Sequence, residues 1–252
     1  MKTLQTPITY GIKYAGSKLK IIPYIVDVIS SLNGIDTVCD AFSGTTRVSQ
    51  AFAQLGYNTT SNDIAIWSDV FAHCYLISDK KDSFYQEIID YLNSLKGYDG
   101  WYTEHYGSEV DNKKPFQSKN TRKLDAIRDE IETLNLNWAD KSVVLTSLIY
   151  ALDKVDSTLG HYVAYLSKWS PRSQKELFLK LPPRFPLKVN NHRVIRDDVF
   201  KTVSKNEFDF VYFDPPYGSN NAKMPPSRVR YASYYHIWTT IINHDKPKIF
   251  GK

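Results

Sequence analysis

The fold class of this chain follows from one stretch, DTVCDAFSGTTRVSQAFAQLGYNTTSND, at residues 36–63. Residues 36–41 have the apolar pattern of a short strand, and a Ser-Gly-Thr turn separates them from a helical pattern over residues 47–55. An extended pattern returns at residues 57–62, and Asp63 follows it. An acid about 20 residues beyond such a turn completes the strand, turn, helix, strand order of a nucleotide-binding βαβ half. The sequence therefore predicts an α/β fold with a Rossmann-like beginning.

Strand patterns return near the C-terminal end of the chain, at residues 193–196 (RVIR) and 209–213 (DFVYF). The second is a continuous apolar run of the kind that is buried in a parallel sheet. Apolar residues three and four apart predict helices over residues 20–32, 66–77, 83–95, 121–134, 141–154 and 231–243.

The middle of the chain lacks the alternation of strands. Within it, residues 96–120 are polar and aromatic, and we expect them to form a long loop. The simplest organisation is one discontinuous α/β domain, residues 1–66 and 192–252, which carries a mainly helical and basic insertion over residues 67–191.

The composition is that of a globular chain, since 42% of its 252 residues are hydrophobic and 23% are charged. The mean hydropathy is -0.40 and no run of about 18 apolar residues occurs, so the sequence predicts no membrane-spanning helix. The first residues lack the apolar segment of a secretory signal, and we expect a cytoplasmic protein without a membrane partner. Cys39 and Cys74 are expected to be reduced core residues, and neither they nor the histidines have the spacing of metal ligands.

The basic residues gather in one stretch of a chain whose net charge is only +5. Residues 166–196 contain eight basic residues and one acid, Glu176. Trp169, Phe178 and Phe185 are interleaved with these charges, a mixture that suits a surface facing a phosphate backbone. Charge alone leaves a second interpretation open, namely a solvated basic face without a partner.

Asp214, Pro215, Pro216 and Tyr217 directly follow the last apolar run. In an open parallel sheet this position lies at the carboxyl ends of the strands, where ligands bind. The prolines fix two φ angles and remove two N–H donors, so the carbonyl groups there are held stiffly as acceptors. An aspartate beside such carbonyls can accept both hydrogens of an exocyclic amine, and a tyrosine offers a flat face to a base. The four residues suit an amino-purine, although a plain turn at the end of a strand would have the same sequence.

Four motifs stand in a fixed order: KYAGSK at residues 13–18, DAFSGT at 40–45, ND at 62–63 and DPPY at 214–217. With them the chain resembles the Dam-like, alpha-group DNA adenine-N6 methyltransferases over residues 10–252. The resemblance implies a site-specific enzyme with S-adenosylmethionine as cofactor. Its reaction would place a methyl group on the N6 amine of an adenine flipped out of double-stranded DNA. The resemblance is compatible with a restriction-modification system and with a cognate restriction endonuclease as partner.

The resemblance also implies roles for individual residues. Asp214, Pro215, Pro216 and Tyr217 correspond to the catalytic motif, in which Tyr217 stacks on the flipped base. The residues that correspond to cofactor contacts are Tyr14, Lys18, Asp40, Phe42, Ser43, Gly44, Asp63 and Asp198. The residues expected to face DNA are Lys168, Arg172, Lys175 and Arg184, together with residues 98–120.

Two of these acids correspond to defined parts of the cofactor. Asp63 resembles the acid on the ribose hydroxyls. Asp198, or its neighbour Asp197, resembles the acid near the adenine amine, with a cap of the next helix as the alternative.

Two features depart from the family pattern. Thr46 stands where the family often has a second glycine, and we expect it to cap the following helix instead. Few residues follow Tyr217, so we expect the C-terminal strands of the family sheet to be missing: either the chain is a fragment or another chain completes the sheet. Two alternatives to the adenine enzyme stay open, a cytosine-N4 DNA methyltransferase and a DNA-binding fragment or subunit without turnover.

Overall fold

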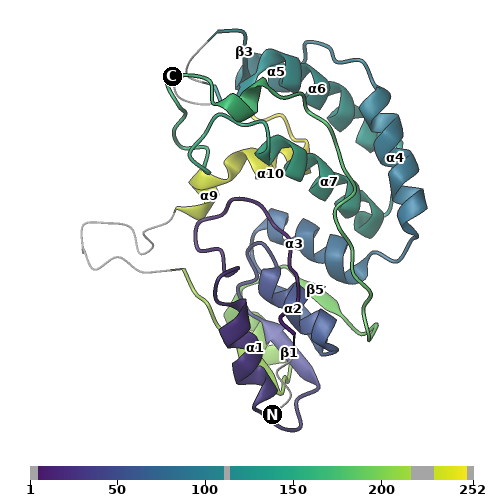
Figure 1. Cartoon of the computed structure of the whole chain (residues 1–252), viewed down its shortest axis with the longest axis vertical. Coiled ribbons are helices and arrows are strands. Elements are labelled where there is room, and N and C mark those ends of the chain that lie inside the picture. The colour runs from purple at the N-terminus through teal and green to yellow at the C-terminus, as the bar shows by residue number, and fades with distance from the viewer. Residues whose placement is uncertain (1–4, 111–113, 217–229, 249–252) are drawn as a thin grey trace, which may run out of the picture. The chain divides into compact units, whose positions relative to one another are not determined.

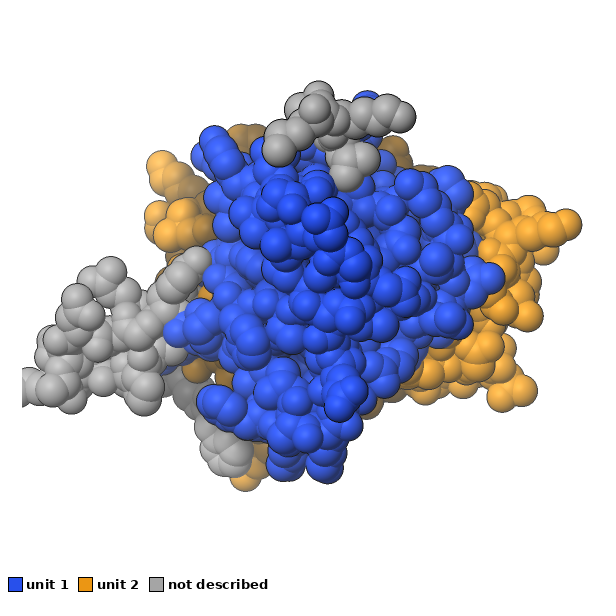
Figure 2. Space-filling model, turned by 90° about the horizontal axis from the view of Figure 1, so that it is seen from below, with its two compact units in different colours: residues 1–78, 183–230 blue, residues 79–182, 231–252 orange. Residues whose placement is uncertain are grey.

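The chain folds into two compact units that each combine segments distant in sequence (Figure 1). The structure, a computed structural model, describes residues 5–110, 114–216 and 230–248. The two units, which Figure 2 colours separately, are residues 1–78 with 183–230 and residues 79–182 with 231–252.

These units do not follow the predicted domain boundaries. Residues 67–78 and 183–191, which we expected in the insertion, pack with the sheet, because Ala72 and Leu76 share a hydrophobic cluster with Leu187. The described part of residues 231–252, which we expected beside the sheet, belongs to the helical unit.

The first unit contains a four-stranded parallel sheet, which confirms the α/β prediction. Its strands are β1 (Thr37–Asp40), β2 (Asn58–Asn62), β5 (Arg193–Ile195) and β6 (Phe210–Tyr212). Their order across the sheet is β5-β2-β1-β6. The strands β2 and β5 thus follow β1 on one side, and β6 lies on its other side. In such sheets, ligands bind where the strand order reverses, beyond the carboxyl ends of the strands.

Helices of the first unit pack on this sheet. They are α1 (Ile22–Ser30), α2 (Arg47–Leu55), α3 (Ile66–Ala72) with the π-helical turn η1 (His73–Ile77), and α8 (Val199–Lys205). Phe52 of α2 is fully buried against Ile29 and Val38, and the ring of Phe210 meets it edge-on with centroids 5.9 Å apart. Cys39 and Cys74 are buried free thiols, as predicted.

The second unit is mainly helical. Its helices are α4 (Asp82–Ser94), α5 (Trp101–Tyr106), α6 (Ser118–Thr133), α7 (Trp138–Asp153), α9 (Tyr231–Tyr234) and α10 (His236–Asn243), with the 3-10 turn η2 (Pro171–Gln174). Two short strands, β3 (Gly107–Ser108) and β4 (Phe116–Gln117), pair in parallel.

The long loop predicted over residues 96–120 is wrong in part, because it contains α5 and the two short strands. The α5 helix begins where Asp125 of α6 accepts hydrogen bonds from the backbone N–H groups of Tyr102 (2.8 Å) and Thr103 (2.9 Å). A cap supplied from another helix satisfies the first N–H groups of α5 and leaves no local signal in its sequence.

The last apolar run is less buried than its pattern predicts. Phe210, Val211 and Tyr212 of β6 are all half-buried, and among the described residues β6 pairs with β1 alone. The apolar run therefore forms a strand at the sheet margin of this unit. Throughout the described part of the chain, no helix combines the length and the apolar character needed to cross a membrane.

Candidate active site

The carboxyl ends of β1 and β6 bring two of the sequence motifs to one edge of the sheet. Asp40 is in register with Tyr212, and the N–H of Ala41 donates to the carbonyl oxygen of Tyr212 at 3.0 Å. The chain leaves β1 through Phe42 and leaves β6 through Asp214, so the two loops start side by side.

The loop after β1 is held by the end of β2. The N–H of Gly44 donates to Asp63 Oδ2 at 2.8 Å, and the N–H of Ser43 donates to the carbonyl oxygen of Asn62 at 2.9 Å. Asp63 Oδ1 accepts from the N–H of Ala65 at 2.9 Å. Burial raises the pKa of Asp63, and these N–H donors act against the shift.

Gly44 sits at the tightest point of this loop. Its φ is +51°, in the left-handed region that favours glycine, and a Cβ there would lie 3.2 Å from Cε1 of Tyr14. The structure therefore brings Tyr14, Gly44 and Asp63 together, and their contact with a cofactor stays a prediction. Phe42 packs with Val199 and Val211.

Thr46 does not cap α2, so that prediction is wrong. Its φ is +60° and its side chain makes no cap hydrogen bond; Thr46 Oγ1 instead accepts from Gln50 Nε2 at 3.1 Å. A β-branched residue in the left-handed region is strained, which explains why glycine suits this position.

Asp40 lies beneath the loop and is 1% exposed. Its Oδ2 accepts from the N–H (2.9 Å) and the Oγ (2.6 Å) of Ser49, and its Oδ1 has no hydrogen-bond partner in the described structure. Burial, with a smaller contribution from the negative charges of Asp63 and Asp214, raises the pKa of Asp40 to about 7 against the opposing effect of the Ser49 hydrogen bonds. A buried acceptor beneath a glycine loop fits a cofactor that carries a donor group, as S-adenosylmethionine does with its ammonium.

Asp214 forms an ion pair with Lys18, which joins the first and last motifs of the sequence. The two side chains are 12% (Lys18) and 19% (Asp214) exposed, and Lys18 Nζ also donates to the carbonyl oxygen of Gly16 at 2.9 Å. The resemblance gave Lys18 a place near the cofactor and did not predict this pairing. Pro215 and Pro216 are exposed, and Tyr217 lies outside the described residues.

Asn62 is a site residue whose role the sequence did not reveal. It is 1% exposed, and its Nδ2 donates to the carbonyl oxygen of Ala41 at 3.0 Å while its Oδ1 accepts from Thr202 Oγ1 at 2.7 Å. One amide thus ties the end of β2 to the end of β1 and to α8. The available signal was a strand made only of polar residues, NTTSN, that ends in Asn62.

Asp198 caps a helix, which was the alternative to its cofactor role. It is the N-cap of α8, and its Oδ1 accepts from the N–H of Phe200 at 2.8 Å. Asp197 Oδ1 accepts from the N–H of Asp198 at 2.7 Å. Asp198 is exposed, and the contact with a cofactor adenine stays a prediction for both acids.

The four basic residues expected on DNA fall into two kinds. Lys168 and Lys175 are exposed. Arg172 is half-buried and donates to the carbonyl oxygens of Asp156 (2.7 Å) and Thr158 (2.6 Å). Arg184, also half-buried, belongs to the first unit and donates there to the carbonyl oxygen of Ser78 at 2.8 Å.

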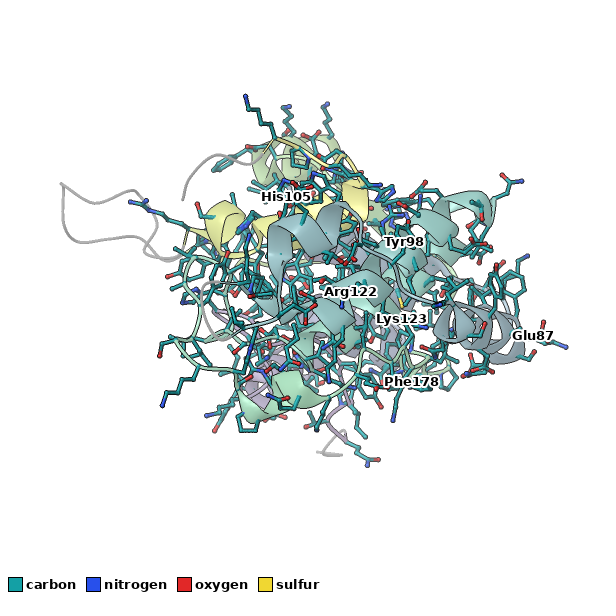
Figure 3. The ribbon with its side chains drawn as sticks, turned by 90° about the horizontal axis from the view of Figure 1, so that it is seen from above. Glu87, Tyr98, His105, Arg122, Lys123 and Phe178 are labelled. Atoms are coloured by element: carbon teal, nitrogen blue, oxygen red, sulfur yellow. The ribbon has the colours of Figure 1, made fainter. Side chains whose placement is uncertain are left out.

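The aromatic residues of the basic stretch divide in the same way. Phe178, labelled in Figure 3, is 57% exposed. Trp169 is half-buried, and Phe185 stacks on Tyr75 with ring centroids 5.8 Å apart. Phe178 is thus the most accessible of the three aromatic side chains.

Comparisons with known proteins agree with the motifs. Residues 14–252 match the family described as D12 class N6 adenine-specific DNA methyltransferase. The chain is 30% identical to modification methylase StsI of Streptococcus sanguinis and 28% identical to modification methylase LlaI of Lactococcus lactis subsp. lactis; each match covers 95% of this chain and 37% or 40% of the relative, respectively. A third relative, type II methyltransferase M.CviAII of Paramecium bursaria Chlorella virus 1, is 29% identical over 95% of this chain and 71% of its own length. The chain thus spans about two fifths of the length of the first two relatives.

Proposed function

The chain belongs to the D12 class of N6 adenine-specific DNA methyltransferases, and from this premise we propose that it methylates the N6 amine of adenine in double-stranded DNA with S-adenosylmethionine as methyl donor. The observation that carries the proposal is the meeting of Gly44, Asp63 and Asp214 at the carboxyl ends of neighbouring strands. We expect the reaction to occur in the cytoplasm.

The loop after β1 would hold the cofactor. Gly44 leaves its backbone open to close approach, Tyr14 flanks it, and Asp63 and Asp40 supply carboxylate acceptors. When bound, S-adenosylmethionine supplies an electrophilic methyl group. Asp63 is partly engaged by two loop N–H groups, so its orientation is fixed before any ligand arrives.

Asp214 would bind the target amine. In the structure its carboxylate already accepts from an ammonium, that of Lys18, so it is oriented to receive N–H donors. The carbonyl oxygen of Pro215, stiffened by the two prolines, would accept the second amine hydrogen. Both acceptors draw the nitrogen lone pair out of conjugation with the ring and aim it at the methyl donor. Positioning of this kind contributes most of the acceleration.

Extrusion of the adenine precedes this binding, because a paired and stacked base hides its N6 nitrogen. Flipping costs a few kcal/mol, which contacts to the free base and to the opened duplex offset. Tyr217 is proposed to stack on the extruded base.

The test is methyl transfer from labelled S-adenosylmethionine to unmethylated duplex DNA, followed by digestion to nucleosides and identification by mass. We expect N6-methyladenine. The Asp214→Ala variant should lose at least about 100-fold of the rate, because it loses an acceptor used in the transition state. Its affinity for S-adenosylmethionine, measured by calorimetry, should stay within about threefold of the wild-type value.

Asp27→Ala is the matched control, since Asp27 is an exposed carboxylate of the same unit. It should retain the wild-type rate. Full activity in Asp214→Ala would refute the assigned role. N4-methylcytosine as product would support the cytosine alternative, and tight DNA binding without any product would support a binding subunit.

The relatives named modification methylases support a further part of the proposal, that methylation protects DNA from a cognate restriction endonuclease. Plasmid DNA methylated by the protein should resist at least one sequence-specific endonuclease that cuts the unmethylated plasmid.

A further inference from the structure

A loop of the second unit presents an apolar side chain to solvent. Thr158 and Tyr165 form an antiparallel bridge that closes residues 158–165, hereafter the 158–165 loop. Gly160 turns the chain with φ +98°. Beside it Leu159 is 72% exposed, whereas Thr158 is 2% exposed. A buried residue, Thr158, is thus followed directly by an exposed one, Leu159.

The 158–165 loop is anchored from inside by Tyr162, which is 3% exposed. The Tyr162 ring lies 5.2 Å from the Trp238 ring in an edge-on arrangement and 6.0 Å from the ring of Phe116. Its N–H donates to the carbonyl oxygen of Tyr234 at 2.8 Å. Aromatic packing of this kind fixes the loop on the helical unit.

Arg172 clamps the base of the same loop. It donates to the carbonyl oxygens of Asp156 and Thr158 and pairs with Asp156 Oδ1 at 2.7 Å. Asp156 is 1% exposed, and its Oδ2 accepts from Thr158 Oγ1 at 2.5 Å. Leu159 therefore projects from a fixed base.

Exposed cations follow this apolar tip in the sequence, and Ser157, at the base of the loop, donates from its Oγ to the carbonyl oxygen of Lys168 at 3.4 Å. Lys168 follows the loop closely and is exposed, as is Lys175. Lys119 contacts the residues between these two lysines, because its Nζ donates to the carbonyl oxygen of Gln174 at 2.6 Å. DNA has a charged phosphate backbone around apolar stacked bases. An apolar side chain followed by cations therefore suits DNA better than it suits an apolar protein surface.

We propose that Leu159 is a wedge that inserts between stacked bases of DNA and helps to open the duplex for base flipping. The inference rests on the proposed function and adds to it the residue that disturbs the base stack. Apolar side chains such as leucine unstack base steps when they enter from a groove, and the energy of unstacking is otherwise an obstacle to flipping. In this scheme Arg172 is a positioning residue for the wedge and makes no phosphate contact.

The test begins with sequencing of plasmid DNA methylated by the wild-type protein, which gives the target site. Two duplexes of that site are then compared, one fully paired and one with an abasic position opposite the target adenine. On the paired duplex, Leu159→Ala should slow methyl transfer at least about tenfold, and should reduce the fluorescence rise of 2-aminopurine placed at the target. On the abasic duplex, whose target is already unpaired, the two proteins should differ by less than about twofold.

Two variants control for the chemistry and the position. Leu159→Met keeps a long apolar side chain and should restore most of the rate. Val163→Ala shortens another exposed aliphatic side chain of the loop, 56% exposed, and should leave the rate unchanged. Leu159 is exposed, so its truncation removes little buried surface, and circular dichroism should show unchanged folding.

Equal rates for wild type and Leu159→Ala on the paired duplex would overturn the wedge and leave the proposed function standing. Equal slowing on both duplexes would also overturn it, because the residue would then act in binding alone. Absence of any methylated product from wild-type protein would refute the proposed function and the wedge with it.

Discussion

Burial changes the pKa of the Asp40 carboxyl group. The folded state raises the pKa of this group to about 7 through burial, with the charges of Asp63 and Asp214 adding to the shift. Its ordinary value is about 3.9. Between about pH 4 and pH 7 the folded protein holds a proton that the unfolded chain has released. This site therefore lowers the free energy of unfolding as the pH rises through that window.

We predict that Asp40→Asn flattens this dependence. The amide keeps an acceptor for Ser49 and does not titrate. Urea unfolding at several values between about pH 5 and pH 8 should show the wild-type stability falling, relative to the variant, as the pH rises to about 7 and levelling off above it. Asp27→Asn, at an exposed carboxylate, should show no such change. A difference between wild type and Asp40→Asn that is constant over pH would contradict the prediction.

Individual site residues could be predicted where a motif fixes the backbone, and their partners could not. Gly44 and Asp63 lie close together because a short loop follows each of their strands. The ion pair of Lys18 with Asp214 depends on two segments at opposite ends of the chain. The sequence does not distinguish Arg172 from Lys168. Arg172 differs because it donates to two backbone carbonyl oxygens, and the sequence does not reveal where those oxygens lie.

At the scale of elements, periodicity predicted most helices and missed α5, whose cap comes from another helix. The pattern over residues 47–55 gave α2 with the observed bounds. In contrast, α5 depends on Asp125 of α6. The helix that contains α10 was predicted, but the contact of its C-terminal end with Arg128 of α6 was not. The spacing of apolar residues within a segment does not reveal contacts with a distant helix. For this reason the sequence placed residues 231–252 with the sheet, whereas their described part belongs to the helical unit.

Arg128 allows this dependence to be tested. It is 0% exposed, and it donates to the carbonyl oxygens of Ile241 (2.5 Å) and Ile242 (3.0 Å) near the end of α10 and pairs with Glu132 at 2.5 Å. Arg128→Met should lower the free energy of unfolding by about 3 kcal/mol, since it leaves buried carbonyls and a carboxylate without their donor.

Arg122 of the same helix is the matched control for that variant. Its side chain, labelled in Figure 3, is 38% exposed and pairs with Asp99 and Glu109. Arg122→Met should destabilise the protein much less, because water screens an exposed pair. Denaturant unfolding of both variants measures the contrast, and equal losses would show that burial does not decide the effect.

Over the whole molecule, the question is which cations of a mildly basic chain bind DNA. The net charge is +5, too small to choose among the 32 lysines and arginines. The sequence indicated the stretch of residues 166–196, and the structure divides its members by what they contact. A cation that already donates to backbone carbonyls has fewer donors left for a phosphate, whereas an exposed lysine keeps all of its own.

We therefore predict that the double substitution Lys168→Glu and Lys175→Glu weakens binding to duplex DNA and reduces the slope of log affinity against log salt concentration by about 2, one unit for each phosphate that is no longer neutralised. The variant should keep its unfolding free energy, because both side chains are exposed. The charge-matched control is Lys80→Glu with Lys81→Glu, two exposed lysines outside the basic stretch, which should leave the slope unchanged. Fluorescence anisotropy with a labelled duplex at several salt concentrations measures both slopes. Equal slopes for the two double variants would mean that net charge alone governs the attraction, and the exposed lysines of the basic stretch would lose their assignment.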